Sequence, residues 1–343
     1  MFQIFRSKAP LRIGLAGGGT DVSPYSELFG GAILNTTISL FAHATIVLTP
    51  EEDTIIVSAA DRNESCTYAM AAQLPVDGYL DLAKGVYNRI VKDYKVPVQS
   101  FKLTTFVDAP AGSGLGTSST LVVAIIGAFV EWLKLPLGEY DIAHYAYEIE
   151  RNDLSLAGGR QDQYAATFGG FNFMEFYGDD KVIVNPLRIK SRLVHELENN
   201  LLLFYTDTSR ESAMIIEKQS KNVVDKNAKS IDAMHLLKDQ AQMMKEALLI
   251  GKLDEIGRIL DFGFQQKKQM ANGISNDLIE RIYEVALANG ATGGKISGAG
   301  GGGFMIFYCP DTSRYAVASA LEKLGGKVHK FQFVTEGLVT WTV

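Results

Sequence analysis

The segment that most constrains the fold is a glycine-rich stretch, Pro110–Ser119, that joins two regular elements. An alternating, strand-like run over residues 101–108 precedes it, and a long apolar run over residues 121–135, typical of a helix, follows it. Three glycines at alternate positions let the backbone turn with positive φ and keep side chains out of the way. The order of strand, glycine loop and helix start therefore predicts a place where backbone N–H groups converge on an anion such as a phosphate.

Two better-known phosphate loops do not match this stretch. A P-loop needs a lysine before its Ser/Thr, and a Rossmann fingerprint that starts at Gly112 needs glycine at position 117, which is threonine. The hydroxyls of Thr117, Ser118 and Ser119 stand at the helix start, where they can hold a phosphate oxygen or Mg²⁺. The alternative interpretation is a plain glycine-rich turn capped by Ser118 or Ser119.

The composition bounds the class of protein. A length of 343 residues suggests one large or two ordinary domains, and 47% hydrophobic with 21% charged residues allows a sizeable core. The formal net charge of −6 argues against general binding to nucleic acid or membrane surfaces, so local groups have to hold any anionic ligand. Two cysteines form no disulfide framework, which fits a reducing cytoplasm. The longest apolar run, residues 121–133, contains Glu131 and is too short to span a bilayer.

Strand and helix patterns alternate irregularly along the rest of the chain. Helices are expected over residues 80–93, 140–152, 227–250, 253–271, 276–289 and 312–324. Strands are expected over residues 2–15, 32–40, 43–49, 167–185, 201–206, 304–308 and 328–334. Pro10 is compatible with the first strand only at a sheet edge or a bulge. The composition becomes charged and polar over residues 187–200, which indicates a domain boundary there.

Two further glycine loops, Ala16–Asp21 and Gly290–Gly303, also adjoin predicted strands. The first, taken alone, is equally compatible with a simple hairpin turn. Four consecutive glycines at residues 300–303 carry an entropic cost that a plain turn does not require. Close backbone approach to a ligand, or between two domains, explains them better.

Two acidic residues are candidates for chemistry. Glu150 lies on the predicted helix 140–152, where the simpler interpretation is a solvated helix face. Asp162 follows the helix-breaking pair Gly158–Gly159, and its simpler interpretation is a helix N-cap.

The three glycine loops resemble, in order and form, the motifs of the GHMP small-molecule kinases, a superfamily that includes galactokinase, homoserine kinase, mevalonate kinase and phosphomevalonate kinase. The match runs from residue 6 to about residue 307 and rests on Pro10-x-Arg12-x-x-Leu15-x-Gly17-Gly18-Gly19-Thr20-Asp21, Gly112-Ser113-Gly114-Leu115-Gly116-Thr117-Ser118-Ser119 and Lys295-x-Ser297-Gly298-Ala299-Gly300-Gly301-Gly302-Gly303. The triple glycine and Gly159–Tyr164 further resemble bacterial D-glycero-D-manno-heptose 7-phosphate kinases, although fucokinase-like members share the triple glycine. Galactokinases have Gly-Glu-His there, so Gly17-Gly18-Gly19 argues against galactose and leaves room for a bulkier sugar.

The resemblance implies an α+β fold of two domains with the ligands between them. An N-terminal, ATP-binding domain like ribosomal protein S5 domain 2 is expected over residues 1–190, and a C-terminal ferredoxin-like domain over residues 191–343. The implied cofactors are ATP and Mg²⁺, and the implied acceptor is the anomeric hydroxyl of a sugar phosphate. We expect a cytoplasmic monomer or homodimer whose partners are small molecules, with no nucleic acid and no membrane.

The resemblance also assigns roles to individual residues. Asp162 matches the catalytic aspartate of the galactokinase branch, Arg12 the basic residue paired with it, and Ser119 and Glu150 the Mg²⁺ ligands. ATP phosphates are expected on Pro110, Gly112, Ser113, Gly114, Leu115, Gly116, Thr117, Ser118 and Ser119. The sugar is expected on Gly18, Gly19, Thr20, Asp21, Gly300 and Gly301.

A sugar 7-phosphate needs an additional cationic pocket, for which Lys8, Arg160, Arg210 and Lys295 are candidates that the sequence does not rank. Another sugar-1-kinase, such as a fucokinase-like enzyme, is the second hypothesis. A non-catalytic sensor of sugar and ATP is the third, and the presence of Arg12, Ser119, Glu150 and Asp162 together argues against it.

Overall fold

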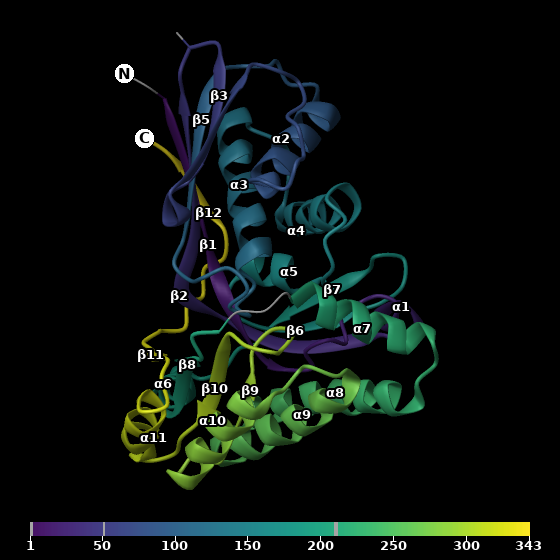
Figure 1. The fold of residues 1–343 in the computed structure, drawn as a ribbon, viewed down its shortest axis with the longest axis vertical. Coiled ribbons are helices and arrows are strands. Elements are labelled where there is room, and N and C mark those ends of the chain that lie inside the picture. Colours follow the sequence, from purple (N-terminus) through teal and green to yellow (C-terminus); the bar gives the residue numbers. More distant parts are fainter. Residues whose placement is uncertain (1–2, 51, 209–211) are drawn as a thin grey trace.

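The computed structural model describes residues 3–50, 52–208 and 212–343, and these residues form two sheets with helices packed on them (Figure 1). The first sheet has eight strands in the order β12-β1-β2-β5-β3-β4, with β6 beside β2 and β7 beside β6. Its strands are β1 (Ile4–Ala16), β2 (Gly31–Leu48), β3 (Thr54–Ala59), β4 (Glu64–Ala69), β5 (Phe101–Val107), β6 (Phe171–Phe176), β7 (Val182–Pro186) and β12 (Val339–Thr342).

The helices α2 (Asp81–Tyr94), α3 (Thr117–Leu133), α4 (Glu139–Glu148) and α5 (Gln161–Phe168) cover one face of this sheet (Figure 1). The apolar run after the phosphate loop becomes α3, which is buried along most of its length against α2, α4 and the sheet. A short helix, α1 (Tyr25–Phe29), follows the first glycine loop.

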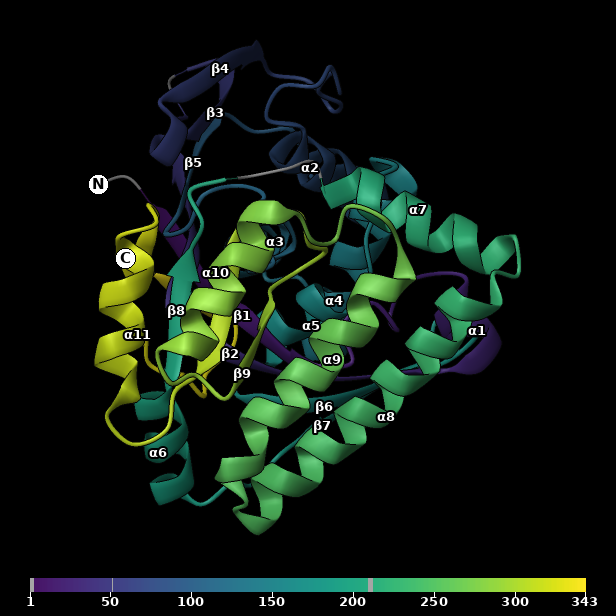
Figure 2. The same cartoon turned by 60° about the horizontal axis from the view of Figure 1, so that its bottom comes forward.

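The second sheet holds β8 (Leu201–Tyr205), β9 (Gly293–Ile296), β10 (Phe304–Tyr308) and β11 (Lys327–His329) in the order β11-β8-β10-β9. Numbered along the chain this order is 4-1-3-2 and antiparallel, which is the ferredoxin-like arrangement. Its helices are α6 (Ser191–Asn200), α7 (Ser212–Val224), α8 (Ala228–Ile250), α9 (Ile256–Met270), α10 (Asp277–Ala288) and α11 (Ser313–Glu322), of which α8, α9 and α10 lie across the front in Figure 2.

The structure corrects several expected boundaries. The expected strands 32–40 and 43–49 are one long strand, β2, because β6 pairs with its first half and β5 with its second. The polar stretch 187–200 contains α6, an amphipathic helix that buries Leu197. The division at residues 190 and 191 stays a prediction, and the last strand, β12, crosses it by pairing with β1.

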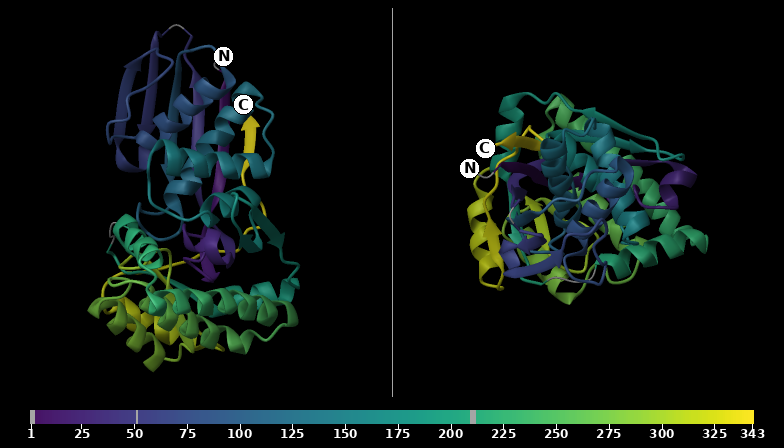
Figure 3. Two further views of the ribbon diagram at one scale, coloured as in Figure 1. Left: turned by 90° about the vertical axis from the view of Figure 1, so that its right-hand side faces the viewer. Right: turned by 90° about the horizontal axis from the view of Figure 1, so that it is seen from above.

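One apolar cluster joins the two halves of the molecule, which Figure 3 shows one above the other. Leu11, Ile13 and Leu15 of β1 belong to the same buried cluster as Leu260 of α9 and Phe304 of β10. The two halves are therefore packed together through a shared core.

No helix in residues 3–50, 52–208 and 212–343 combines the length and apolar character needed to cross a membrane.

An irregularity in the pairing of β1 with β2, whose extra residues 38–40 belong to β2, sets the position of the first site residue. The pairing of β1 with β2 changes register between Pro10 and Arg12, as expected for a proline within a paired strand. The Arg12 backbone N–H is released from the ladder and donates to Leu115 O at 3.1 Å. This backbone hydrogen bond holds Arg12 beside the central glycine loop.

We predict that Phe304→Ala lowers the free energy of unfolding by about 3–5 kcal/mol, because it leaves a cavity in the core that both halves share. Chemical denaturation followed by intrinsic fluorescence measures the change. Tyr315→Ala, at a side chain 75% exposed, is the matched control and should change stability by less than about 0.5 kcal/mol. Equal effects of the two substitutions would contradict a shared core.

Candidate active site

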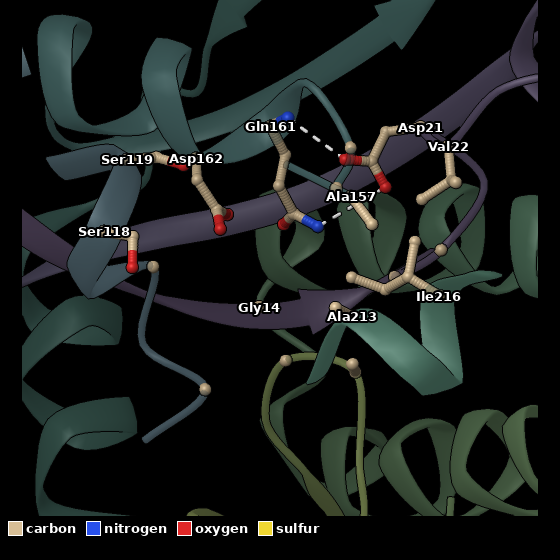
Figure 4. A pocket seen from close by; sticks show the side chains of 18 of the residues that line it. Gly14, Asp21, Val22, Ser118, Ser119, Ala157, Gln161, Asp162, Ala213 and Ile216 are labelled. Atoms are coloured by element: carbon tan, nitrogen blue, oxygen red, sulfur yellow. Dashed lines mark hydrogen bonds between the residues drawn. The ribbon is translucent and has the colours of Figure 1, made fainter. Parts of the chain in front are cut away.

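A cavity of about 360 Å³ lies where the three glycine loops meet (Figure 4). The first glycine loop, the central loop with the start of α3, the segment before α5, and Gly298–Ala299 all contribute to its wall. Lysines from α9 and β9 complete it. The cavity therefore lies between the two halves, where the resemblance to the GHMP kinases places the ligands.

The start of α3 supplies the anion-binding end of the cavity. Gly116 precedes the helix with φ of +77°, a conformation that glycine adopts without strain. The first-turn N–H groups of Thr117, Ser118 and Ser119 have no intrahelical partners, and all three residues line the cavity. A phosphate bound here would receive these N–H groups together with the positive end of the helix dipole.

The glycine loops approach one another closely, backbone against backbone. A Cβ on Gly114 would lie 2.6 Å from Ser297 O, and a Cβ on Gly303 would lie 2.4 Å from Ser113 O. Phe304 N donates to Ser113 O at 2.9 Å, and the Ser297 hydroxyl donates to Gly114 O at 2.8 Å. Several glycines are thus required by contact between the halves, one of the two explanations that the sequence left open.

Arg12 and Asp162 form an ion pair at the cavity wall. Arg12 Nε donates to Asp162 Oδ1 at 2.6 Å, and Arg12 Nη1 donates to Gly114 O at 2.6 Å. Arg12 is buried, whereas the Asp162 side chain keeps 23% of its surface exposed. Arg160, not Asp162, is the N-cap residue of α5, so capping does not account for Asp162.

Glu150 lies on a turn of π-helix, Ile149–Asp153, that continues α4, and it is buried rather than solvated. The Ser119 hydroxyl donates to Glu150 Oε1 at 3.0 Å, and Gln163 Nε2 donates to Ser119 Oγ at 3.1 Å. Burial raises the pKa of Glu150, and the nearest cation, Arg151, is 3.8 Å away. The buried Gln163 Oε1 has no hydrogen-bond partner within the described ranges.

The side chains of Glu150, Ser119 and Gln163 offer a carboxylate, a hydroxyl and an amide oxygen, the ligand types that suit Mg²⁺. In the part of the chain that the structure describes, no group of three or more His, Cys, Asp or Glu side chains forms a complete metal cage. Mg²⁺ is usually bound through one or two protein ligands with phosphate and water supplying the rest, so the residues fit this ion.

Asp21 is buried and caps helix α5. Its Oδ2 accepts from Arg160 N at 2.9 Å and from Gln161 N at 3.0 Å. Burial raises the pKa of Asp21, although the backbone hydrogen bonds oppose that shift. Figure 4 shows Asp21, Gln161 and Asp162 along the same wall of the cavity. Asp21 thus orients α5, and with it Asp162, as well as facing the cavity.

Two buried lysines line the cavity, and only one of them was expected from the sequence. Lys295 Nζ donates to Gly14 O at 2.7 Å, and Lys267 Nζ donates to Gly298 O at 2.6 Å. Burial lowers the pKa of both ammonium groups, that of Lys267 to about 8. Sequence reasoning missed Lys267, yet a signal was present, since it follows the buried Leu260 and Phe264 at helical spacing on the apolar face of α9.

The remaining candidates for a cationic pocket lie elsewhere. Lys8 stacks over Phe41 and does not line the cavity. Arg160 is ion-paired with Glu27 and Asp180, and it too is absent from the wall. Arg210 lies outside the described residues. Lys295 is therefore the one sequence candidate that the structure brings to the cavity among those it describes.

The structure brings together most of the other predicted site residues, but not all. Gly18, Gly19, Gly112, Gly114 and Gly116 line the cavity. Pro110, Ser113, Leu115, Thr20, Gly300 and Gly301 do not. The Thr20 hydroxyl instead bonds backbone oxygens of Gly17 and Ala32, and Gly301 N donates to Ile274 O. These residues shape the loops, whereas Gly298 and Ala299 present the third loop to the cavity.

Comparisons with known proteins agree with this geometry. The model of the N-terminal domain of GHMP kinases matches residues 81–170, and the model of their C-terminal domain matches residues 244–327. D-glycero-alpha-D-manno-heptose 7-phosphate kinase of Campylobacter jejuni is 50% identical over 98% of this chain and 99% of that protein.

Two further relatives extend the comparison. A crystal structure named as a D-glycero-D-manno-heptose 1-phosphate kinase from Bacteroides thetaiotaomicron has a TM-score of 0.84 at 47% identity and covers 99% of each chain. A bifunctional fucokinase/GDP-fucose pyrophosphorylase of Arabidopsis thaliana is 26% identical over 92% of this chain, which matches 31% of that longer protein. Both domain models and a half-identical relative along nearly the whole length show that this chain belongs to the GHMP kinase family.

Proposed function

We propose that this protein is an ATP-dependent kinase that phosphorylates the anomeric hydroxyl of D-glycero-D-manno-heptose 7-phosphate to give the 1,7-bisphosphate, for synthesis of nucleotide-activated heptose. The observation that carries the proposal is the Arg12–Asp162 pair, placed beside the start of α3 in a cavity that also holds two buried lysines. The half-identical heptose 7-phosphate kinase of Campylobacter jejuni supports the choice of acceptor.

The proposed chemistry depends mainly on positioning and charge. The first turn of α3 and the central glycine loop bind the phosphates of ATP, with Ser118 at the exposed edge. Ser119 and Glu150 would hold Mg²⁺, which supplies charge neutralisation when bound. Arg12 lies between Asp162 and the loop, where its guanidinium stabilises charge on the transferring phosphoryl group.

Asp162 orients the anomeric hydroxyl and accepts its proton. Arginine stays protonated at neutral pH, so Arg12 cannot be the base. A general base contributes roughly 10²–10⁴ in rate, and a cation on the transition state roughly 10³–10⁵. We therefore expect Arg12 to matter at least as much as Asp162.

The two heptose-kinase relatives bear different names, since one is called a 7-phosphate kinase and the other a 1-phosphate kinase. A literal 1-phosphate kinase would act on a sugar whose anomeric position is already blocked. We favour the 7-phosphate as acceptor because it leaves the anomeric hydroxyl free for transfer. A fucokinase-like sugar-1-kinase is the second candidate, supported by the relative from Arabidopsis thaliana. We further propose a cytoplasmic monomer or homodimer.

The anion-binding role of the helix start predicts the effect of a charge. Ser118→Asp should preserve the fold, because a carboxylate is favourable at a helix N-terminus. It should also weaken ATP binding at least about tenfold, since the same carboxylate repels phosphate. Calorimetric titration with ATP measures the affinity, and Ser118→Asn is the uncharged control of equal size. Unchanged ATP affinity in a folded Ser118→Asp variant would show that the loop is only a turn.

The substrate assignment predicts an order of specificity. Heptose 7-phosphate should give a higher kcat/KM than fucose, galactose, unphosphorylated heptose or heptose 1-phosphate. A coupled assay of ADP release across this panel measures the order. A larger value for any other acceptor would overturn the proposed substrate and leave the kinase family unaffected.

Separate roles for the two carboxylates predict separable phenotypes. Asp162→Asn should lower kcat by roughly 10²–10⁴ with little effect on ATP affinity. Glu150→Gln should raise the Mg²⁺ concentration needed for half-maximal rate, because added metal partly compensates for a lost ligand. Titration of Mg²⁺ at saturating ATP and sugar distinguishes them. Near-full kcat in Asp162→Asn would exclude a catalytic base at this position, and a defect repaired by Mg²⁺ would make Asp162 a metal ligand.

A further inference from the structure

Backbone conformation explains two of the three consecutive glycines of the first loop, Gly17 and Gly19, but not Gly18. Gly17 and Gly19 have φ of +76° and +106°, and a Cβ on either would collide with Ala32 O or the Met270 side chain. Gly18 has no positive φ, and a Cβ there would meet only Lys267 Nζ, at 3.6 Å. The backbone therefore tolerates a side chain at position 18, but such a side chain would cover the Lys267 ammonium group.

Lys267 reaches the cavity from α9, on the opposite half of the molecule from the phosphate loop. Its side chain is buried, and its ammonium makes a hydrogen bond to Gly298 O. No carboxylate among the described residues forms an ion pair with Lys267, although the negative charges of Asp21 and Asp162 raise its pKa and so partly oppose the effect of burial. An ammonium group has three donors, so at least one is free to bind a ligand.

Lys295 of β9 adds a second buried ammonium group to the cavity wall, from the same half of the molecule as Lys267. It donates to Gly14 O, and a Cβ on Gly14 would lie 3.9 Å from its Nζ. Of the two cations that act on Lys295, Lys267 has a larger effect than Arg12, and this repulsion together with burial is unfavourable for two charged lysines. A bound dianion would relieve both costs.

We infer that Lys267 and Lys295 hold the phosphate group of the sugar phosphate acceptor, and that Gly18 is glycine so that this phosphate can reach Lys267. The inference rests on the proposed function and names the groups that select a phosphorylated sugar. The γ-phosphate of ATP is the other source of the same chemistry. We favour the acceptor because ATP phosphates already have the start of α3 and Arg12, whereas Lys267 lies against Gly18 of the first glycine loop.

The site also has a defined pH dependence. The groups whose charges act on Lys267 are Asp21, Asp162 and Arg12, and Lys267 itself acts on Lys295. A phosphate ester is a dianion above about pH 6, and burial lowers the pKa of Lys267 to about 8. Affinity for the phosphorylated acceptor should therefore be highest between these values and fall as pH rises through 8. Affinity for an unphosphorylated sugar should not fall in that range.

The test measures KM and kcat for heptose 7-phosphate, unphosphorylated heptose and ATP with wild type, Lys267→Met and Gly18→Ala. Lys267→Met should raise KM for heptose 7-phosphate about 10- to 100-fold, and leave the values for unphosphorylated heptose and ATP nearly unchanged. Gly18→Ala should raise the same KM about tenfold, because its methyl group covers the ammonium. Lys268→Met is the matched control, since the next lysine of α9 pairs with Glu280 outside the cavity.

Each outcome has a distinct meaning. If Lys267→Met raises KM for ATP, or lowers kcat equally with both sugars, the lysine binds the transferring phosphate and the inference is overturned. The same holds if the variant keeps the full preference for the phosphorylated sugar. Failure of wild type to use heptose 7-phosphate would instead refute the proposed function, and the inference with it. Circular dichroism of each variant confirms that the fold is retained.

Discussion

The interaction on which the site depends is the contact of Arg12 with Asp162 and Gly114. Arg12 comes from β1 of the first sheet, where the pairing with β2 changes register, Asp162 from the start of α5, and Gly114 from the loop before α3. A single guanidinium therefore fixes the relative positions of the expected base and the phosphate loop. Its planar group of donors suits this task, because several hydrogen bonds leave it in fixed directions.

The surrounding packing supports this arrangement from both halves of the molecule. Backbone contacts between Ser113 and Phe304, and between Gly114 and Ser297, hold the central loop against the second sheet. Asp21 caps α5 and thereby orients the helix that contains Asp162. Residues distant in the chain thus share one small set of hydrogen bonds, so a change in any of them is expected to act on the others.

Much of the fold and of the candidate site was predictable from local sequence patterns. The remainder depended on contacts between residues that are far apart in the chain. The glycine loops and the register shift beside Pro10 follow from backbone restrictions that a sequence displays directly. Gly300 and Gly301, on which the sugar is expected, do not line the cavity, and both lie against Ile274 instead. Lys267 was missed because a lysine in an amphipathic helix usually faces solvent, and only its position on the apolar face marks it. The pairing of β12 with β1 has no local signal.

The most direct test of the account is the position at which phosphate is added. Phosphorus-31 NMR of the reaction with heptose 7-phosphate and ATP records the product while transfer takes place. The account predicts a second phosphate resonance coupled to the anomeric proton, with the resonance of the 7-phosphate retained. A new phosphate on any other carbon, or transfer seen only with heptose 1-phosphate as acceptor, would contradict it.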